Sequence, residues 1–227
     1  MQIKNLYLLA GNPRGKGDIT LNVLKQAIAE TGVSEPKVAY VGTASGDDCS
    51  FFHFLAQLLQ GAGAGVVELC PFVGRRSDTT RAEEILKNCD AVFVSGGEVE
   101  DGILGIPDNA KSLLTNLRAQ GKVFIGLSAG TIMLGKAWPH WDDEDNDFDN
   151  ARLFDCLGFA NAIFDTHAED EGFVELKKAV ELSEKGFVGY GIPSDCALII
   201  HSGGSIEKIG KVFTCTNMDG HAVLEIK

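Results

Sequence analysis

The pentapeptide Gly126-Leu127-Ser128-Ala129-Gly130 has the clearest chemical potential in this sequence. Gly-x-Ser-x-Gly is the pattern of a nucleophile elbow, in which a strand turns sharply into a helix with the serine at the bend. The apolar residues before it and the helix-compatible segment 131–134 after it fit that context. The turn would expose the Ser128 hydroxyl and offer the Ala129 N–H to an oxyanion. The motif predicts a nucleophile at Ser128; the plainer interpretation is a small residue in a tight turn.

A nucleophilic serine requires a general base, for which histidine is the usual side chain. The chain has five histidines: His53, His140, His167, His201 and His221. Three have simpler interpretations: His53 lies among phenylalanines in a predicted helix, His201 ends a predicted strand, and His221 lies in the last turn. His140 is closer to Ser128 in sequence, whereas His167 follows the apolar stretch 160–164, where a strand would end. Because a strand end can meet the nucleophile, the sequence favours His167 and keeps His140 as the alternative.

Two further segments suggest other chemistries. The acidic run 142–149 begins like an EF-hand calcium loop, but Phe148 stands where the glycine should be and no helices flank it. The segment 11–17 is rich in glycine but lacks the Lys-Ser/Thr ending of a phosphate-binding loop. We therefore interpret both as loops, predict no metal and no cofactor, and note that the acidic run could still supply a carboxylate to the site.

The elements that must position these residues alternate along the first half of the chain. Short apolar segments predict buried strands, at residues 3–10, 37–41, 65–69, 91–94 and 123–125. Amphipathic segments between them predict helices, including one that starts at a capping box, Thr80 to Glu83, and one over 108–119. This order predicts an α/β fold with a doubly wound, mostly parallel sheet. Sites in such folds collect at the carboxyl ends of strands, where Gly96-Gly97 and Ser128 fall.

After about residue 138 the pattern becomes strand-rich. Five segments are predicted to form strands or hairpins: 189–191, 196–201, 205–209, 212–216 and 222–226. The pair Gly203-Gly204 is a hairpin signal between two of them. We find no repeat or linker, and predict a single domain over residues 1–227 with a β-rich C-terminal part.

Composition limits the function classes. The net charge of −12 disfavours nucleic acid as a partner, because phosphate backbones are repelled. The six cysteines show neither Cys-x-x-Cys nor zinc spacing, which favours free thiols in a reducing compartment. No signal-peptide pattern and no apolar run approaching about 18 residues is present, so we expect a cytoplasmic protein without a membrane segment.

Four segments together resemble the S51 serine peptidases, the group of dipeptidase E and cyanophycinase. They are Phe93 to Glu98, Gly126 to Gly130, Asp165 to His167 and Gly189 to Leu198, in matching order over roughly residues 3–200. The resemblance implies a flavodoxin-like fold similar to class I glutamine amidotransferases. It also implies Ser128 as the nucleophile, His167 as the base, and an oxyanion hole formed by the N–H groups of Gly97 and Ala129.

The same resemblance gives two candidate regions for the acid of the triad. A dipeptidase-like pattern points to Asp142 or Asp143, past the elbow helix. A cyanophycinase-like pattern points to the segment where Ser194 replaces the expected acid and Asp195 follows it. A substrate aspartate would need a cation, for which Arg75, Arg76 and Arg152 are candidates outside any matched motif.

The leading hypothesis is therefore a serine peptidase acting on a dipeptide or small peptide, including Asp-Xaa. The alternative is a non-catalytic binding or regulatory protein that keeps the amidotransferase-like fold. A glutamine amidotransferase is disfavoured because its elbow nucleophile should be cysteine. An ordinary α/β-hydrolase is disfavoured because its histidine usually lies nearer the C-terminus than His167 does. Oligomeric state is not indicated by the sequence.

Overall fold

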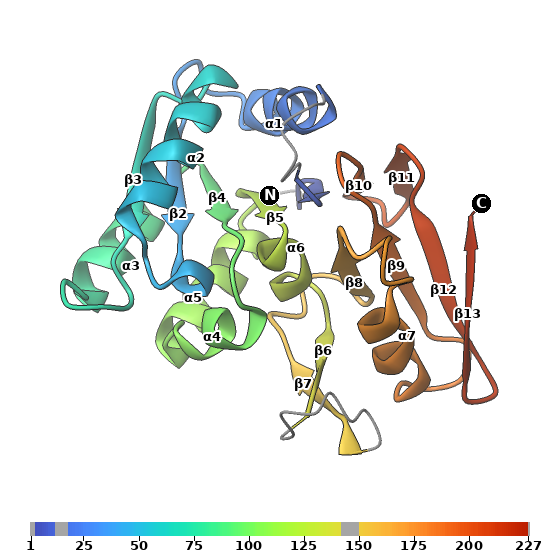
Figure 1. Cartoon of the computed structure of the whole chain (residues 1–227). Helices are drawn as coiled ribbons and strands as arrows, with labels where there is room; N and C mark the ends of the chain where they lie inside the picture. Colours follow the sequence, from blue (N-terminus) through green and yellow to red (C-terminus); the bar gives the residue numbers. More distant parts are fainter. Residues whose placement is uncertain (1–2, 12–17, 142–149, 227) are drawn as a thin grey trace.

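The computed structural model describes residues 3–11, 18–141 and 150–226. Its central sheet has the strand order β11-β10-β1-β5-β4-β2-β3 (Figure 1). These strands are β1 (Leu6–Leu9), β2 (Lys37–Val41), β3 (Val66–Cys70), β4 (Ala91–Val94), β5 (Val123–Leu127), β10 (Ala197–Ile200) and β11 (Ile206–Ile209). The strands from β1 to β3 in this order run parallel, and β10 and β11 add an antiparallel edge.

Helices cover both faces of this sheet, as expected for strands that are apolar on both sides. On one face, α1 (Ile19–Glu30) and α2 (Cys49–Gly61) pack against strand residues that include Tyr40 and Phe93. On the other face, α3 (Thr79–Lys87), α5 (Asp108–Ala119) and α6 (Ala129–Met133) pack against residues that include Val92 and Phe124. The doubly wound, mostly parallel α/β fold predicted from the sequence is confirmed.

The C-terminal part forms a second sheet beside the first (Figure 1). Its order is β13-β12-β9-β8, from β8 (Ile163–Thr166), β9 (Val188–Ile192), β12 (Phe213–Met218) and β13 (His221–Ile226). Helix α7 (Val174–Glu181) packs on this sheet through Leu176 and Val180. Phe164 of β8 and Ile192 of β9 belong to the same core as Val92, so the end of β8 is fixed relative to the central sheet.

Some elements differ from the sequence prediction. The capping box at Thr80 is wrong: Asp78 caps α3 by accepting a hydrogen bond from the Arg81 N–H at 2.9 Å, and Thr80 lies inside the helix. Aspartate at the N-cap satisfies the free N–H as well as threonine does, so the helix begins earlier. The prediction also missed α4 (Val99–Leu104), α7 and the hairpin strands β6 (Ala137–His140) and β7 (Arg152–Asp155), which are short or contain proline.

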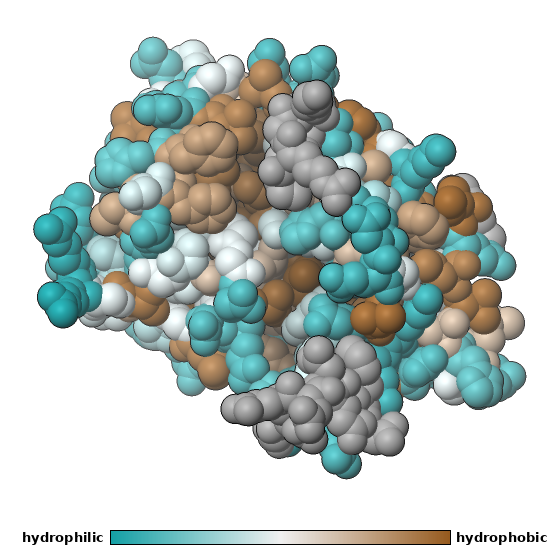
Figure 2. All heavy atoms as spheres, viewed as in Figure 1, coloured by the Kyte–Doolittle hydropathy of each residue, from teal (hydrophilic) through white to brown (hydrophobic). Residues whose placement is uncertain are grey.

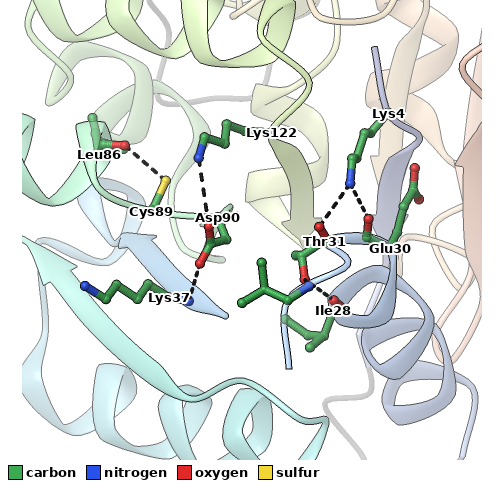
Figure 3. A network of polar contacts seen from close by, with 10 residues as sticks. Lys4, Ile28, Glu30, Thr31, Lys37, Leu86, Cys89, Asp90 and Lys122 are labelled. Atoms are coloured by element: carbon green, nitrogen blue, oxygen red, sulfur yellow. Dashed lines mark hydrogen bonds and ion pairs between the residues drawn. The ribbon is translucent and has the colours of Figure 1, made fainter. Parts of the chain in front are cut away.

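At the amino ends of the parallel strands, side chains tie neighbouring connections together (Figure 3). Asp90, just before β4, accepts a hydrogen bond from the Lys37 N–H at 3.0 Å and lies 3.9 Å from the Lys122 ammonium. The Asp90 N–H in turn donates to the Lys37 carbonyl at 2.8 Å. This edge is opposite to the carboxyl ends that carry Ser128, so its contacts serve the sheet and not the site. In the described part of the chain, none of the helices has the length and apolar character needed to cross a bilayer.

Candidate active site

Ser128 stands at the bend between β5 and α6 in an unusual backbone conformation. Its φ is 54° and its ψ is −124°, a combination that costs a non-glycine residue free energy and is found at functional turns. The two flanking glycines are required by close packing. A Cβ on Gly130 would lie 2.0 Å from the Val94 carbonyl oxygen, and a Cβ on Gly126 would lie 2.7 Å from the Thr131 Cα. The motif is therefore an elbow in geometry as well as in sequence.

The last carbonyl of β1 holds the elbow in place. Leu9 accepts a hydrogen bond from the Ser128 N–H at 2.9 Å and a second from the Thr131 hydroxyl at 2.8 Å. Thr131 is fully buried, so its hydroxyl is committed to this contact. Sequence reasoning identified Thr131 only as helix-compatible. The one available signal was a polar side chain within an otherwise apolar helix start.

His167 reaches Ser128 from the neighbouring sheet. The residue follows β8, and its N–H donates to the Ile192 carbonyl at 2.9 Å. Its imidazole Nε2 lies 2.7 Å from the Ser128 Oγ, within hydrogen-bond distance. His140 is not brought to the serine; its Nδ1 lies 2.7 Å from a Glu100 carboxylate oxygen. Of the two histidines that the sequence left open, the structure places His167 at the hydroxyl.

Gly97 lies beside the elbow in a backbone conformation suited to glycine. Its φ is 141°, and a Cβ there would lie 1.9 Å from the Ala44 carbonyl oxygen. The next N–H, of Glu98, donates to that same carbonyl at 2.8 Å and so fixes the turn. Gly97, Ser128 and Ala129 line one cavity. The two residues of the predicted oxyanion hole therefore flank the serine, and their role there stays a prediction.

The predicted acids are placed less favourably. Asp142 and Asp143 lie outside the described residues. Asp195 is half-buried with a φ of 55°, and its N–H donates to the Gly11 carbonyl at 2.8 Å. One Asp195 carboxylate oxygen is buried without a hydrogen-bond partner among the described residues. Within the same residues, the His167 side chain is hydrogen-bonded to Ser128 and to no carboxylate. The third member of the triad is therefore not decided by this arrangement.

The cavity beside Ser128 has a volume of about 560 Å³ and a strongly acidic wall. Six carboxylates line it: Glu98, Glu100, Asp101, Asp165, Glu171 and Glu175. No lysine or arginine is found in its wall among the residues that the structure describes. Arg75, Arg76 and Arg152, the candidates for binding a substrate aspartate, do not line it. No group of three or more carboxylate, histidine or cysteine side chains in the described ranges converges as metal ligands would.

Asp165 is the most deeply buried of these carboxylates, with 3% of its surface exposed. Burial, followed by the negative charge of Glu175, raises its pKa from 3.8 to about 7. The N–H groups of Thr166 and Leu176 oppose this shift in the pKa, and Glu171 adds to it. Burial and the charges of Glu171 and Glu98 also raise the pKa of Glu175. The wall therefore brings several carboxyl groups close together. Burial and mutual repulsion make two of them, Asp165 and Glu175, harder to ionise.

A second, apolar cavity of about 380 Å³ adjoins the other side of the serine. It shares Gly97, Ser128 and His167 with the acidic cavity. Its apolar wall comes from the elbow and from α1 and α2: Leu21, Phe51, Phe54, Leu55, Leu58 and Leu127. Figure 2 shows apolar surface gathered over α2 on this face of the molecule. Ser128 thus lies between an acidic cavity and an apolar one.

A family model for peptidase family S51 matches residues 7–208 of this chain. The chain belongs to peptidase family S51. It is thus a serine-type peptidase, as the sequence predicted. The match spans the elbow, the Gly96-Gly97 strand end and His167, the segments on which the resemblance rested.

Two solved structures share the fold of this S51 peptidase. A peptidase from an acI-B1 actinobacterium superposes with a TM-score of 0.73 at 17% identity, covering 99% of this chain and 95% of that one. A putative peptidase E protein from Listeria monocytogenes EGD-e superposes with a TM-score of 0.58 at 16% identity, covering 95% and 99%. No curated protein matches the sequence. At these identities the structures support the fold alone.

Proposed function

We propose that this S51 peptidase hydrolyses a dipeptide or similarly small peptide with Ser128 as nucleophile and His167 as general base. The observation that carries the proposal is the 2.7 Å contact between Ser128 Oγ and His167 Nε2 at a strained elbow. That distance lies within the range from which an imidazole can take a hydroxyl proton. The adjoining cavity of about 560 Å³ falls in the size range typical of small-molecule sites.

The proposed reaction follows from these positions. His167 takes the Ser128 proton as the hydroxyl oxygen attacks the peptide carbonyl carbon, and the carbonyl oxygen becomes an oxyanion. The N–H groups of Gly97 and Ala129 donate to that oxyanion. His167 then protonates the leaving amine, and the C–N bond breaks to give an ester on Ser128. Water, deprotonated by the same imidazole, hydrolyses the ester and regenerates the serine.

The acid that orients His167 remains a choice between Asp142, Asp143 and Asp195. Its function would be to hold the imidazole tautomer and to stabilise the imidazolium. The unpartnered, buried oxygen of Asp195 supports its candidacy, whereas the lack of a contact with His167 counts against it. We retain all three candidates.

The alternative, a non-catalytic binding protein, was suggested by two features of the sequence. The acid of the triad has several candidates, and Ser194 replaces an expected acid. A separation of Ser128 and His167 well beyond hydrogen-bond distance would have favoured it. The 2.7 Å distance supports catalysis instead.

Covalent labelling tests the proposed nucleophile. A fluorophosphonate probe should label the wild-type protein and should fail to label Ser128→Ala. Ser112→Ala removes the exposed hydroxyl of a serine on α5, away from both cavities, and this variant should be labelled like the wild type. His167→Ala should slow labelling strongly. Equal labelling of Ser128→Ala and the wild type would overturn the assignment.

A further inference from the structure

The acidic wall of the cavity beside Ser128 holds more carboxylates than basic groups: besides His167 at the serine, the basic side chain among the described lining residues is His140, whose Nδ1 lies 2.7 Å from Glu100. Its six carboxylates come from three places in the fold: the start of α4, the end of β8, and the segment that leads into α7 together with the first turn of that helix. Burial raises the pKa of Asp165 and of Glu175 most, and repulsion adds to it: Glu175 raises the pKa of Asp165, and Glu171 and then Glu98 raise that of Glu175. Such repulsion destabilises the empty site and is relieved when a cation enters.

Asp165 marks where that cation would bind. Only 3% of its surface is exposed, yet it lines the cavity. One carboxylate oxygen accepts a hydrogen bond from the Thr166 N–H at 2.7 Å. The other oxygen is buried and makes no hydrogen bond of 3.5 Å or less to a described residue, although the Leu176 N–H in the first turn of α7 is near enough to the carboxylate to lower its pKa. An unpaired buried carboxylate oxygen is costly, so it points to a partner that arrives with the substrate.

The charge of the wall also decides which end of a peptide enters. The C-terminal carboxylate of a small peptide would be repelled by the ionised carboxylates of this wall, and the N-terminal ammonium would be attracted. The N-terminal residue therefore occupies the acidic cavity. The leaving residue then lies toward the apolar cavity, whose wall includes Phe51, Phe54 and Leu58. A single ammonium uses only part of the acidic wall, so a second positive charge on the same residue is accommodated.

We propose that the acidic cavity selects peptides whose N-terminal residue is lysine or arginine, with Asp165 as the carboxylate that pairs with the cationic side chain. This inference rests on the proposed function and specifies its substrate class. It departs from the Asp-Xaa specificity considered from the sequence, because an N-terminal aspartate would add a negative charge to this wall and meet no lysine or arginine among the described lining residues.

The test compares peptides that differ only in the charge of the first residue. Arg-Leu, Lys-Leu, norleucyl-Leu, Gln-Leu and Asp-Leu are incubated with the wild type, and release of free leucine is measured. We expect kcat/KM for Arg-Leu and Lys-Leu to exceed that for norleucyl-Leu and Gln-Leu at least tenfold, and Asp-Leu to be the poorest substrate. Equal rates across the set, or a preference for Asp-Leu, would overturn the inference and leave the proposed function intact.

Asp165→Asn tests the residue itself. Asparagine keeps an oxygen to accept the Thr166 N–H, so the strand end is preserved while the charge is removed. The variant should lose the preference for Arg-Leu over norleucyl-Leu, measured as the ratio of the two kcat/KM values. An unchanged preference would refute the role of Asp165. If Asp165→Asn does not fold, the wild-type comparison still decides the specificity, and Glu175→Gln provides a second variant that should reduce the preference.

Binding separates this inference from the proposed function. The affinity of Ser128→Ala for Arg-Leu and for norleucyl-Leu is measured by titration calorimetry, which does not require turnover. Tighter binding of Arg-Leu together with failed hydrolysis by the wild type would support the cationic specificity and overturn the catalytic proposal. Equal affinities would overturn the specificity whatever the enzyme hydrolyses.

Discussion

The carbonyl oxygen of Ala44 occupies the place where a side chain on Gly97 would begin, because a Cβ atom on residue 97 would lie only 1.9 Å from it. The same carbonyl accepts the Glu98 N–H at 2.8 Å, so the turn after β4 cannot shift without breaking that bond. Residue 97 is therefore restricted to glycine by packing and by its φ of 141°. The backbone of residue 97 is thereby fixed in the wall of the cavity that Ser128 also lines.

Gly97→Ala should consequently lower stability, because the new Cβ meets backbone atoms, and should also lower kcat in the protein that folds. Relief of the clash would move the Gly97 N–H away from the oxyanion, and loss of one such donor costs roughly 10²- to 10³-fold in kcat. The measurement is kcat on the best dipeptide, with circular dichroism to confirm folding. Gly203→Ala is the matched control, because a Cβ there meets nothing within 4 Å and its φ is not positive. A Gly97→Ala enzyme with wild-type kcat would remove Gly97 from the oxyanion hole.

Thr131→Val tests how the elbow is held. The substitution keeps the shape of the side chain but removes the hydroxyl that donates to the Leu9 carbonyl at 2.8 Å. We expect a loss of about 1 kcal/mol in the free energy of unfolding, the typical net value of one hydrogen bond. Because Leu9 also accepts the Ser128 N–H, kcat should fall as the elbow loosens. Thr131→Ser, which keeps the hydroxyl, should restore kcat; equal kcat in both variants would mean that the hydroxyl does not position Ser128.

The triad acid can be assigned by three substitutions made one at a time: Asp142→Asn, Asp143→Asn and Asp195→Asn. Substitution of the true partner of His167 should lower kcat roughly 10²- to 10⁴-fold with little change in KM, because this acid acts on the imidazole and not on the substrate. The other two should stay within about threefold of the wild type, a margin typical of context-dependent effects. Wild-type kcat in all three would show that Ser128 and His167 act as a pair without any of these acids.

Sequence reasoning reached the elements and the elbow because both depend on local patterns. Strands β2 and β4 and helix α5 fall at the predicted residues, since short apolar runs and helical periodicity are short-range signals. The approach of His167 to Ser128 depends instead on β8 belonging to a second sheet that shares a core with the first. The sequence narrowed the choice to two histidines and favoured His167, and the 2.7 Å distance between its Nε2 and the Ser128 Oγ comes from the tertiary structure.

The acidic wall was beyond sequence reasoning for a similar reason. Glu98, Asp165 and Glu175 are far apart in the chain, and each alone resembles an ordinary surface or strand-end carboxylate. The acidic run that the sequence did indicate, residues 142–149, lies outside the described part of the structure. Burial of Asp165 at the end of β8 is what distinguishes it, and strand periodicity gives no sign that an aspartate at that position faces a cavity.

Asp90→Ala should affect stability without affecting the site. Asp90 accepts the Lys37 N–H at 3.0 Å at the amino ends of the strands, opposite to Ser128. Removal of the acceptor should lower the free energy of unfolding by about 1.5 kcal/mol, the low end for a hydrogen bond to a charged group, because the bond is exposed to solvent. Urea denaturation measures this change, and kcat/KM should remain at the wild-type value. A large loss of kcat/KM in a folded Asp90→Ala protein would show that the two ends of the sheet are coupled.

The buried Asp165 should make stability fall as pH rises. Its pKa is about 7 in the folded protein, against an ordinary value of 3.8, so the folded state binds more protons between these values. This contribution to the free energy of unfolding is fully present below about pH 4 and is lost as pH rises through about 7. The difference between these pKa values corresponds to at most about 4 kcal/mol. Asp165→Asn should therefore gain stability relative to the wild type between about pH 4.5 and about pH 8.

Urea denaturation at about pH 4.5, 6 and 8 measures this gain for both proteins. Glu175 and Glu171 also face Asp165, so the comparison uses the difference between variant and wild type at each pH, in which their titration largely cancels. Asp108→Asn, at a fully exposed side chain on α5, controls for the loss of a carboxylate. A difference between Asp165→Asn and the wild type that does not change with pH would mean that Asp165 is ionised throughout, and would remove the energetic reason for its buried oxygen to await a cation.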